Sequence, residues 1–377
     1  MAVVRAANRT VLAVDPVEVV RADGPDGLAV LDRLRTGWWA GMLSYDLGRA
    51  TEPFQTVTAP DVRIPDVLWA RFDARLEIPD GAQSEPVLAG RGPARDRLAE
   101  LVAHPCRDSD PPPVALGPPR SSLDRPAFEA GVRRILQHLE VGDCYQVNLT
   151  RRLEWQRRAD PTALFRRLLA ANPAPHAALV RLGDIAIVSA SPESFLRVDG
   201  RTVTTRPIKG TGRDARALAA SAKDRAENVM IVDLARNDLG RVCEYGSVSV
   251  PALCVPEEHP GLVHLVSTVT GTLRADVGLR DLVAATFPPA SVTGCPKPRV
   301  LQIIEALEPV RRGPYCGAIG FVDSDAGTVD LNVAIRTFVT TPAGTELGVG
   351  AGIVADSDPA AEWQETELKV ARLLSAT

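Results

Sequence analysis

Apolar residues in the middle of the chain recur at helical spacing. Five apolar positions, Phe128, Val132, Ile135, Leu136 and Leu139, recur at helical spacing in a segment that begins after Asp124 and ends at Gly142, so the pattern predicts a helix. The next segment, 144–150, alternates its side chains in the manner of a β-strand. This part of the chain is therefore predicted to pass directly from a helix into a strand.

The hydrophobic pattern also predicts helices and strands before and after this segment. The segment Gly37–Asp46 reads as a strand followed by a turn. Helices are predicted at 161–171, 214–239, 279–286, 297–307 and 359–375, and strands at 178–182, 185–190, 195–198, 202–206, 247–250, 317–322, 333–340 and 345–354. Helices that are grouped between strands, without strict alternation, predict an α+β fold of largely antiparallel sheets with flanking helices.

A change in composition suggests a boundary. Between about 79 and 120 the chain is rich in Pro, Gly, Arg and Asp, and it includes the run Asp110–Pro113. We therefore predict an N-terminal region, 1–117, that ends in a Pro-rich linker, and a second region, 118–377.

Length and charge exclude several classes of protein. The chain has 377 residues, of which 45% are apolar, so it can bury a substantial core in one large domain or about two domains. The net charge of −4, without a basic run interleaved with aromatic residues, excludes a general nucleic-acid binder. No stretch reaches the length of a membrane span, and the N-terminus lacks a signal-peptide pattern, so we expect no membrane, a cytoplasmic location and a small ligand.

The cysteines predict no metal site. The six cysteines are scattered without a C-x-x-C pair, and the five histidines show no zinc spacing, so we expect reduced and mostly buried thiols. They are Cys106, Cys144, Cys243, Cys254, Cys295 and Cys316.

Lys209 is the strongest candidate for chemistry. It follows the β-rich run 202–206 and precedes Gly210, so rigid backbone presents its amine at a strand end, where burial lowers an amine pKa and favours nucleophilic attack. A solvated surface lysine beside a turn fits the same pattern.

Two helices each carry a pair of acids. Ser221 caps a predicted helix with Asp224 and Glu227 three positions apart, which places both carboxylates on one face. Asp358 caps the last helix, which carries a second such pair, Glu362 and Glu365. Each pair alone fits a solvated helix face, whereas two pairs that face one another suit Mg²⁺ bound together with an anionic substrate.

Three further features suit an acidic substrate. The glycine run 348–352 leaves backbone N–H groups open to a carboxylate. Arg336, expected in an apolar strand, has a guanidinium that fits a carboxylate or a structural ion pair. Glu193, between two strands, is either a turn residue or a general acid with a raised pKa.

Taken together, several runs resemble the chorismate-utilising enzyme family over roughly 125–377. Within that family, the run Pro207–Thr211 resembles the aminodeoxychorismate synthase group, because anthranilate synthases usually carry alanine at the position of Lys209. The segment from Trp39 to Arg49 resembles the same group. The runs that carry the family resemblance are 191–193, 206–211, 224–228, 233–238, 293–297, 335–337 and 348–365.

The resemblance implies a fold and a set of roles. It implies an anthranilate-synthase-like fold of two packed, largely antiparallel sheets, with chorismate in the cleft between them. It also implies Mg²⁺ held by Glu227 and Glu365, with Asp224 and Glu362 acting through water. The positions that match substrate contacts are Gly210, Thr211, His264, Thr293, Tyr315, Arg336, Gly350 and Gly352.

The implied reaction begins with attack of Lys209 on carbon 2 of chorismate while Glu193 acts as general acid on the carbon 4 hydroxyl. Ammonia then enters at carbon 4 and expels the lysine. No glutamine-hydrolysing triad is recognisable, so the resemblance implies a separate glutamine amidotransferase subunit that supplies ammonia. Gln146 stands where isochorismate and salicylate synthases carry a water-activating lysine, which argues against water as the nucleophile. The alternatives are an anthranilate synthase component I and a non-catalytic chorismate-binding subunit.

Overall fold

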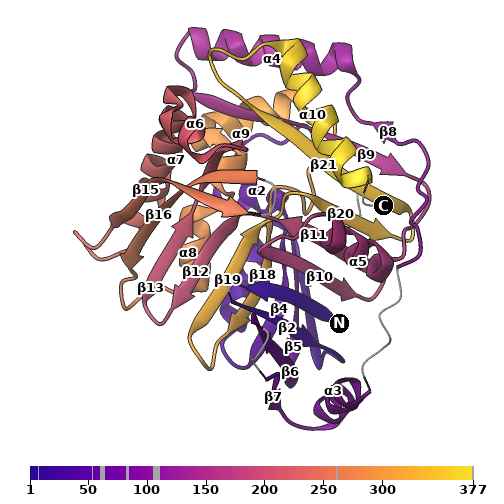
Figure 1. Cartoon of the computed structure of the whole chain (residues 1–377). Helices are drawn as coiled ribbons and strands as arrows, with labels where there is room; N and C mark the ends of the chain where they lie inside the picture. The colour runs from indigo at the N-terminus through magenta and orange to yellow at the C-terminus, as the bar shows by residue number, and fades with distance from the viewer. Residues whose placement is uncertain are drawn as a thin grey trace.

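Two large β-sheets pack face to face, and helices cover their outer sides (Figure 1). The computed structural model describes residues 1–6, 8–52, 54–59, 64–81, 85–104, 111–259 and 262–375. All strand pairings within these residues are antiparallel. The predicted α+β class with largely antiparallel sheets is therefore confirmed.

The first sheet runs in the order β17-β9-β21-β20-β11-β10-β1-β2-β6-β7, and β8 also pairs with β9. Its strands are β1 (Ala2–Ala6), β2 (Arg9–Ala13), β6 (Ala74–Pro79), β7 (Val87–Gly90), β8 (Arg120–Ser121), β9 (Gln146–Trp155), β10 (His176–Leu182), β11 (Ile185–Ser191), β17 (Gly294–Cys295), β20 (Thr337–Thr341) and β21 (Gly344–Ile353).

The second sheet runs in the order β14-β16-β13-β12-β19-β18-β4-β5-β3, and β15 also pairs with β16. Its strands are β3 (Glu18–Ala22), β4 (Trp38–Leu43), β5 (Val67–Phe72), β12 (Ser194–Asp199), β13 (Thr202–Arg206), β14 (Ile208–Gly212), β15 (Ser249–His259), β16 (Leu262–Thr272), β18 (Ala318–Asp323) and β19 (Thr328–Val333).

An apolar layer joins strands of both sheets. Trp38 and Met42 of β4 and Phe321 of β18 belong to one buried cluster with Val4 of β1 and Ile187 of β11. These strands come from the second and the first sheet respectively, so the cluster forms the interior between them. Successive side chains of a strand point to opposite faces of its sheet. A strand that is covered on both faces therefore buries nearly all of its side chains, which explains the nearly continuous apolar runs in this part of the sequence.

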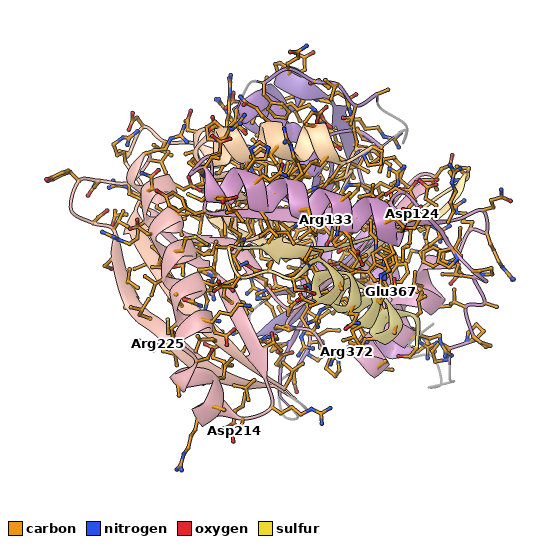
Figure 2. The ribbon with its side chains drawn as sticks, turned by 90° about the horizontal axis from the view of Figure 1, so that it is seen from above. Asp124, Arg133, Asp214, Arg225, Glu367 and Arg372 are labelled. Atoms are coloured by element: carbon orange, nitrogen blue, oxygen red, sulfur yellow. The ribbon has the colours of Figure 1, made fainter. Side chains whose placement is uncertain are left out.

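Helices close the outer faces. Helices α7 and α8 contribute to a cluster with strands of the second sheet, and α4 and α9 pack with β9 and β21 of the first. Helices α4 and α10 lie together, as Figure 2 shows by Arg133 on α4 and Arg372 on α10. The helices are α1 (Gly24–Val30), α2 (Gly48–Thr51), α3 (Pro93–Ala103), α4 (Arg125–Glu140), α5 (Pro161–Ala171), α6 (Ala215–Ala220), α7 (Ala222–Gly240), α8 (Leu279–Thr286), α9 (Lys297–Leu307) and α10 (Pro359–Leu374). Among the described residues, none of these helices is both long and apolar enough to cross a membrane.

Most predicted elements are present, and two are divided. The predicted helix 214–239 is two helices, because Ser221 leaves the helical conformation and its hydroxyl accepts the backbone N–H of Asp224 to start α7. The predicted strand 333–340 is also wrong as one element, because β19 ends at Val333 and β20 begins at Thr337. Between them Arg336 has φ +51°, which is incompatible with an extended strand.

The first 117 residues contribute strands to both sheets. Strands β1 and β2 lie between β10 and β6 in the first sheet, and β4 pairs with β18 in the second. The two predicted regions therefore share their sheets, and the boundary near 118 stays a prediction. Part of the predicted linker, with Cys106, lies outside the described residues. The other five cysteines are unpaired thiols, as expected.

Candidate active site

The amine of Lys209 is buried on β14. Its Nζ donates a hydrogen bond to the backbone carbonyl of Ser291 at 3.1 Å. Burial lowers the pKa of Lys209, and this effect exceeds the opposing attraction of Glu193 and Glu227. A buried amine with a lowered pKa is more readily neutral and therefore nucleophilic.

Glu193 lies in the turn between β11 and β12, where a carboxyl group is fully enclosed. Burial raises the pKa of Glu193 to about 7, although the Ser291 hydroxyl, the Lys209 charge and the Ile208 backbone N–H each act to lower it. Glu193 and Lys209 are therefore close enough for the charge of each to act on the pKa of the other. A carboxyl that titrates near neutrality is suited to general acid catalysis.

The turn after Lys209 depends on glycine. Gly210 has φ +80°, and a Cβ placed there would lie 3.0 Å from Asp224 Oδ1 at the start of α7. An L-residue would thus be strained and would push the helix away. The next residue, Thr211, shares a hydrogen bond of 3.0 Å between its hydroxyl and Nδ1 of His264 on β16. The structure therefore brings three predicted substrate contacts together beside one acidic pair.

The acidic pairs lie on α7 and α10. Burial raises the pKa of Glu227, and the like charges of Asp224 and Glu365 add to this effect. Burial also raises the pKa of Glu362, and Glu365 again contributes. The two helices thus place their carboxylates near enough to repel one another, as the sequence predicted.

These carboxylates fit Mg²⁺ in chemistry. Hard carboxylate oxygens are the ligands that Mg²⁺ prefers, and a cation would relieve the repulsion that raises the pKa of Glu227. Within the described ranges no group of three or more ligating side chains is assembled. Mg²⁺ is usually bound by only one or two carboxylates of the protein, and substrate and water complete its coordination shell. At present Glu365 pairs with Lys369 at 2.6 Å, and Ser357 donates to Glu362 at 2.6 Å.

Arg336 supplies a positive charge without a carboxylate partner. It lies in the break between β19 and β20, not in the strand that the sequence predicted. Burial lowers the pKa of its guanidinium, and the charge of Arg372 adds to this effect. In the part of the chain that the structure describes, no acidic side chain forms an ion pair with Arg336, so its charge is available to an anion.

The glycine run of β21 lies against other predicted contacts. A Cβ at Gly352 would lie 3.5 Å from Gln146 Nε2 and 3.8 Å from Lys209 Nζ, so that face of the strand looks toward the amine. The Tyr315 ring packs onto Gly348, and Lys369 donates to the carbonyl of Gly350 at 2.8 Å. Gly350 thus contacts Lys369 of α10, and Gly352 lies beside Lys209.

Thr293, a predicted substrate contact, and Gln146 are both fully buried. The Thr293 hydroxyl donates to the carbonyl of Pro289 at 2.9 Å, and the residue is fully buried. Gln146 is fully buried as well, and both of its amide atoms lack a hydrogen-bond partner among the described residues. An unsatisfied buried amide costs about 1–3 kcal/mol, so its presence beside Lys209 points to a functional requirement.

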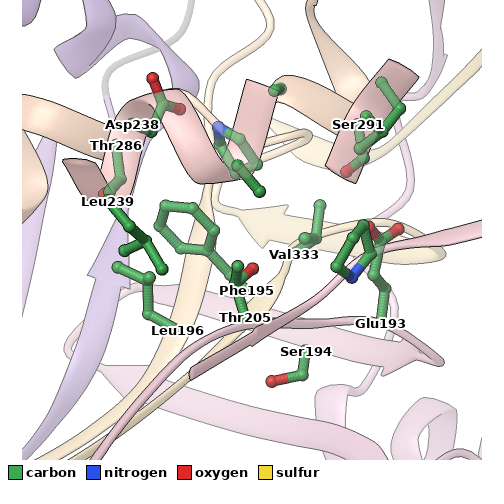
Figure 3. Close-up of a pocket in the computed structure, with 15 residues that line it drawn as sticks. Glu193, Ser194, Phe195, Leu196, Thr205, Asp238, Leu239, Thr286, Ser291 and Val333 are labelled. Atoms are coloured by element: carbon green, nitrogen blue, oxygen red, sulfur yellow. The ribbon is translucent and has the colours of Figure 1, made fainter. Parts of the chain in front are cut away.

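A small pocket, with room of about 30 Å³ for the centres of water-sized molecules, adjoins Glu193. Figure 3 shows Glu193 and Ser291 at one end, Asp238, Thr286 and Leu239 at the other, and Phe195 between them. Most of the lining residues are apolar, and Glu193 itself is only 5% exposed. This explains why burial dominates the pKa of that carboxyl.

Comparisons with known proteins agree with this geometry. The family model described as chorismate binding enzyme matches residues 6–375. The chain belongs to the chorismate binding enzyme family.

Relatives in the chorismate binding enzyme family carry two kinds of name. The aminodeoxychorismate synthase component 1 of Klebsiella aerogenes is 43% identical over 349 residues, which cover 89% of this chain and 76% of that protein. The anthranilate synthase component 1 of Thermus thermophilus is 38% identical over 359 residues, 90% of this chain and 77% of that protein. The crystal structure of anthranilate synthase component I from Streptococcus pneumoniae has a TM-score of 0.87 at 27% identity, covering 98% and 92% of the two chains. The predicted anthranilate-synthase-like fold is therefore confirmed.

Sequence reasoning missed two residues of this chorismate binding enzyme. Ser291 contacts both Lys209 and Glu193, and Lys369 joins Glu365 to the backbone of Gly350. The spacing of Lys369 four residues after Glu365 is a signal for an ion pair on one helix face. Ser291 gives no such signal, because its contacts come from distant segments.

Proposed function

We propose that this chain is an aminodeoxychorismate synthase component I that converts chorismate and ammonia to 4-amino-4-deoxychorismate. The single observation that carries the proposal is the buried Lys209 amine beside Glu193, because an amine and an acid are the two groups that a covalent substitution needs. The names of the relatives with 38–43% identity support the same activity.

Substrate binding would use the cationic and backbone groups around Lys209. Arg336 would pair with one carboxylate of chorismate, and the backbone of Gly210 and Thr211 would contact the other. Tyr315, His264 and Thr293 are proposed to shape the rest of the pocket. Orientation by these groups would hold carbon 2 against the amine, which is a large part of what an enzyme contributes to a substitution.

The chemistry divides into two substitutions. Lys209 Nζ forms a bond to carbon 2, the two conjugated ring double bonds each shift by one position, and the carbon 4–oxygen bond breaks. Glu193 gives its proton to the departing hydroxyl, which leaves as water. Ammonia then forms a bond at carbon 4, and the electron pair of the carbon 2–nitrogen bond returns to Lys209. One proton lost from the ammonia nitrogen restores Glu193, and any proton that Lys209 gives up in the adduct returns to it as its neutral amine leaves. Two modest barriers replace one high barrier.

Mg²⁺ is proposed to be held by Glu227 and Glu365, with Asp224 and Glu362 acting through water. When bound, it would neutralise carboxylate charge of the substrate. A glutamine amidotransferase subunit is proposed as the source of ammonia, and the expected cytoplasmic location stays a prediction.

Product analysis tests the function. Purified protein would be incubated with chorismate, Mg²⁺ and an ammonium salt at mildly alkaline pH, with and without an aminodeoxychorismate lyase, and the products resolved by mass. We expect aminodeoxychorismate, converted to p-aminobenzoate only when lyase is present. Anthranilate would contradict the role of Lys209, isochorismate would contradict the exclusion of water at Gln146, and bound but unchanged chorismate would mean a non-catalytic subunit.

The metal assignment predicts the effect of Glu227→Gln. The substitution removes a charged ligand but keeps the shape of the side chain, so the Mg²⁺ concentration for half-maximal activity should rise by at least about tenfold, since even outer-shell partners contribute about 10- to 100-fold to metal affinity. A Mg²⁺ titration of turnover, together with thermal unfolding at each concentration, would measure it. Asp233→Asn, at an exposed position on the same helix, is the matched control. An unchanged Mg²⁺ requirement would remove Glu227 from the metal site.

A further inference from the structure

Ser291 lies in a short turn whose position does not depend on its own side chain. The turn is a 3₁₀ segment, Ala290–Val292. The Thr293 hydroxyl donates to the Pro289 carbonyl at 2.9 Å, and the buried guanidinium of Arg312 donates to the Val292 carbonyl at 2.9 Å. The turn is therefore anchored at Pro289 and at Val292, on the two sides of Ser291.

From this turn Ser291 contacts both reacting side chains of the proposed mechanism. Its backbone carbonyl accepts a hydrogen bond from Lys209 Nζ at 3.1 Å, and its hydroxyl lies close enough to the Glu193 carboxyl group to lower the pKa of that group, since both residues line the same pocket. Figure 3 shows Ser291 and Glu193 at the same end of the pocket. Lys209 comes from β14, Glu193 comes from the turn between β11 and β12, and Ser291 comes from a third, distant segment.

Such an arrangement is useful because both reacting side chains have several rotatable bonds. Holding a lysine or glutamate side chain in one rotamer costs conformational entropy, and most of the residues that line the pocket beside Glu193 are apolar. We propose that Ser291 is a positioning residue of the reaction: its carbonyl aims the Lys209 amine and its hydroxyl aims the Glu193 carboxyl group. This inference rests on the proposed function.

The hydroxyl of Ser291 also has an electrostatic consequence. A donor stabilises the charged carboxylate and so lowers the pKa of Glu193, against the larger effect of burial. The other groups that act on Glu193 are the charge of Lys209 and the backbone N–H of Ile208, and neither is changed by substitution at position 291. Removal of the hydroxyl should therefore raise the pKa of Glu193 above about 7, whereas a residue that only fills space would leave that pKa unchanged.

The test compares Ser291→Ala, Ser291→Cys and Ser291→Thr with the wild-type protein. Each variant keeps the carbonyl that Lys209 contacts, while alanine has no donor, cysteine has a weak one and threonine keeps a hydroxyl. The rate of aminodeoxychorismate formation is measured against pH at a fixed concentration of free NH₃. Because Glu193 must be protonated to act as an acid, activity falls as pH rises through its pKa.

For Ser291→Ala we expect kcat to fall by about 10- to 100-fold, part of the roughly 10²–10⁴ that a positioned general acid contributes, and the alkaline limb to move to higher pH. Ser291→Cys should show a smaller displacement of that limb, and Ser291→Thr should restore it. Thr286→Val is the matched control, because it removes a hydroxyl that donates to Leu282 at the other end of the same pocket. Its alkaline limb should not move.

An unchanged alkaline limb in both Ser291→Ala and Ser291→Cys would overturn the inference, even if both variants were slower. A displaced limb that Ser291→Thr fails to restore would also overturn it. If Ser291→Ala does not fold, as judged by thermal unfolding, the comparison of cysteine with threonine decides. Failure of the proposed function is distinguishable, since wild-type protein would then form no aminodeoxychorismate at all.

Discussion

Lys209→Ala should abolish most aminodeoxychorismate formation, with kcat reduced by at least about a thousandfold, because removal of the nucleophile from a covalent mechanism costs up to roughly a millionfold. The physical reason is the burial that lowers the pKa of Lys209 and makes its amine available for attack. The rate would be measured by mass-resolved product formation from chorismate, Mg²⁺ and ammonium. Full activity in the variant would refute the nucleophile assignment.

A second readout of Lys209 does not depend on turnover. With chorismate and Mg²⁺ but no ammonia, intact-protein mass analysis of the wild type should show a covalent adduct of chorismate that has lost one water. The adduct should be absent from Lys209→Ala and present in Lys223→Ala, a lysine in the first turn of α7. An adduct that survives in Lys209→Ala would place the covalent bond on another residue.

Glu193→Gln should reduce kcat by roughly 10²–10⁴, the usual contribution of a general acid, because the amide has nearly the same shape but no acidic proton. The direction in which kcat changes with pH follows from the pKa of Glu193. The pKa of Glu193 is raised to about 7, so the wild-type protein holds the reactive proton below that pH and loses it as pH rises through about 7. The wild-type kcat should therefore decline on the alkaline side, and Glu193→Gln should lack that decline.

The control for this prediction is Glu244→Gln. Glu244 is half-exposed and pairs with Arg201, away from the pocket, so its replacement should change neither kcat nor the alkaline limb. An alkaline limb that persists in Glu193→Gln would assign the titration to a different group, and the general acid with it.

Local patterns of the sequence predicted the helices that carry the acidic pairs. Ser221 and Asp358 cap α7 and α10 as expected, since a short polar side chain before an apolar period satisfies the free N–H groups of a helix start. Spacing of three residues then places both acids of a pair on one face without any knowledge of the fold. The fold class also followed from local alternation, because strands with apolar and polar sides suit antiparallel sheets.

Arg336 shows where local reasoning was insufficient. Its apolar neighbours predicted a continuous strand, but the backbone turns to φ +51° there and separates β19 from β20. The conformation depends on neighbours distant in sequence, including the bond from the Ala190 N–H to the Arg336 carbonyl. No pattern within the segment contains that information.

The sequence by itself determined which groups this protein has for chemistry: a lysine before a glycine turn, an acid between two strands, and two acidic pairs on capped helices. These depend on contacts between near neighbours in the chain. Only the tertiary structure decided their ionisation, because burial by distant segments lowers the pKa of Lys209 and raises that of Glu193. It also decided that Ser291 lies beside both Lys209 and Glu193. The hydrogen bond from Lys209 to Ser291 connects segments far apart in the chain, so it exists only when the sheets and turns have packed.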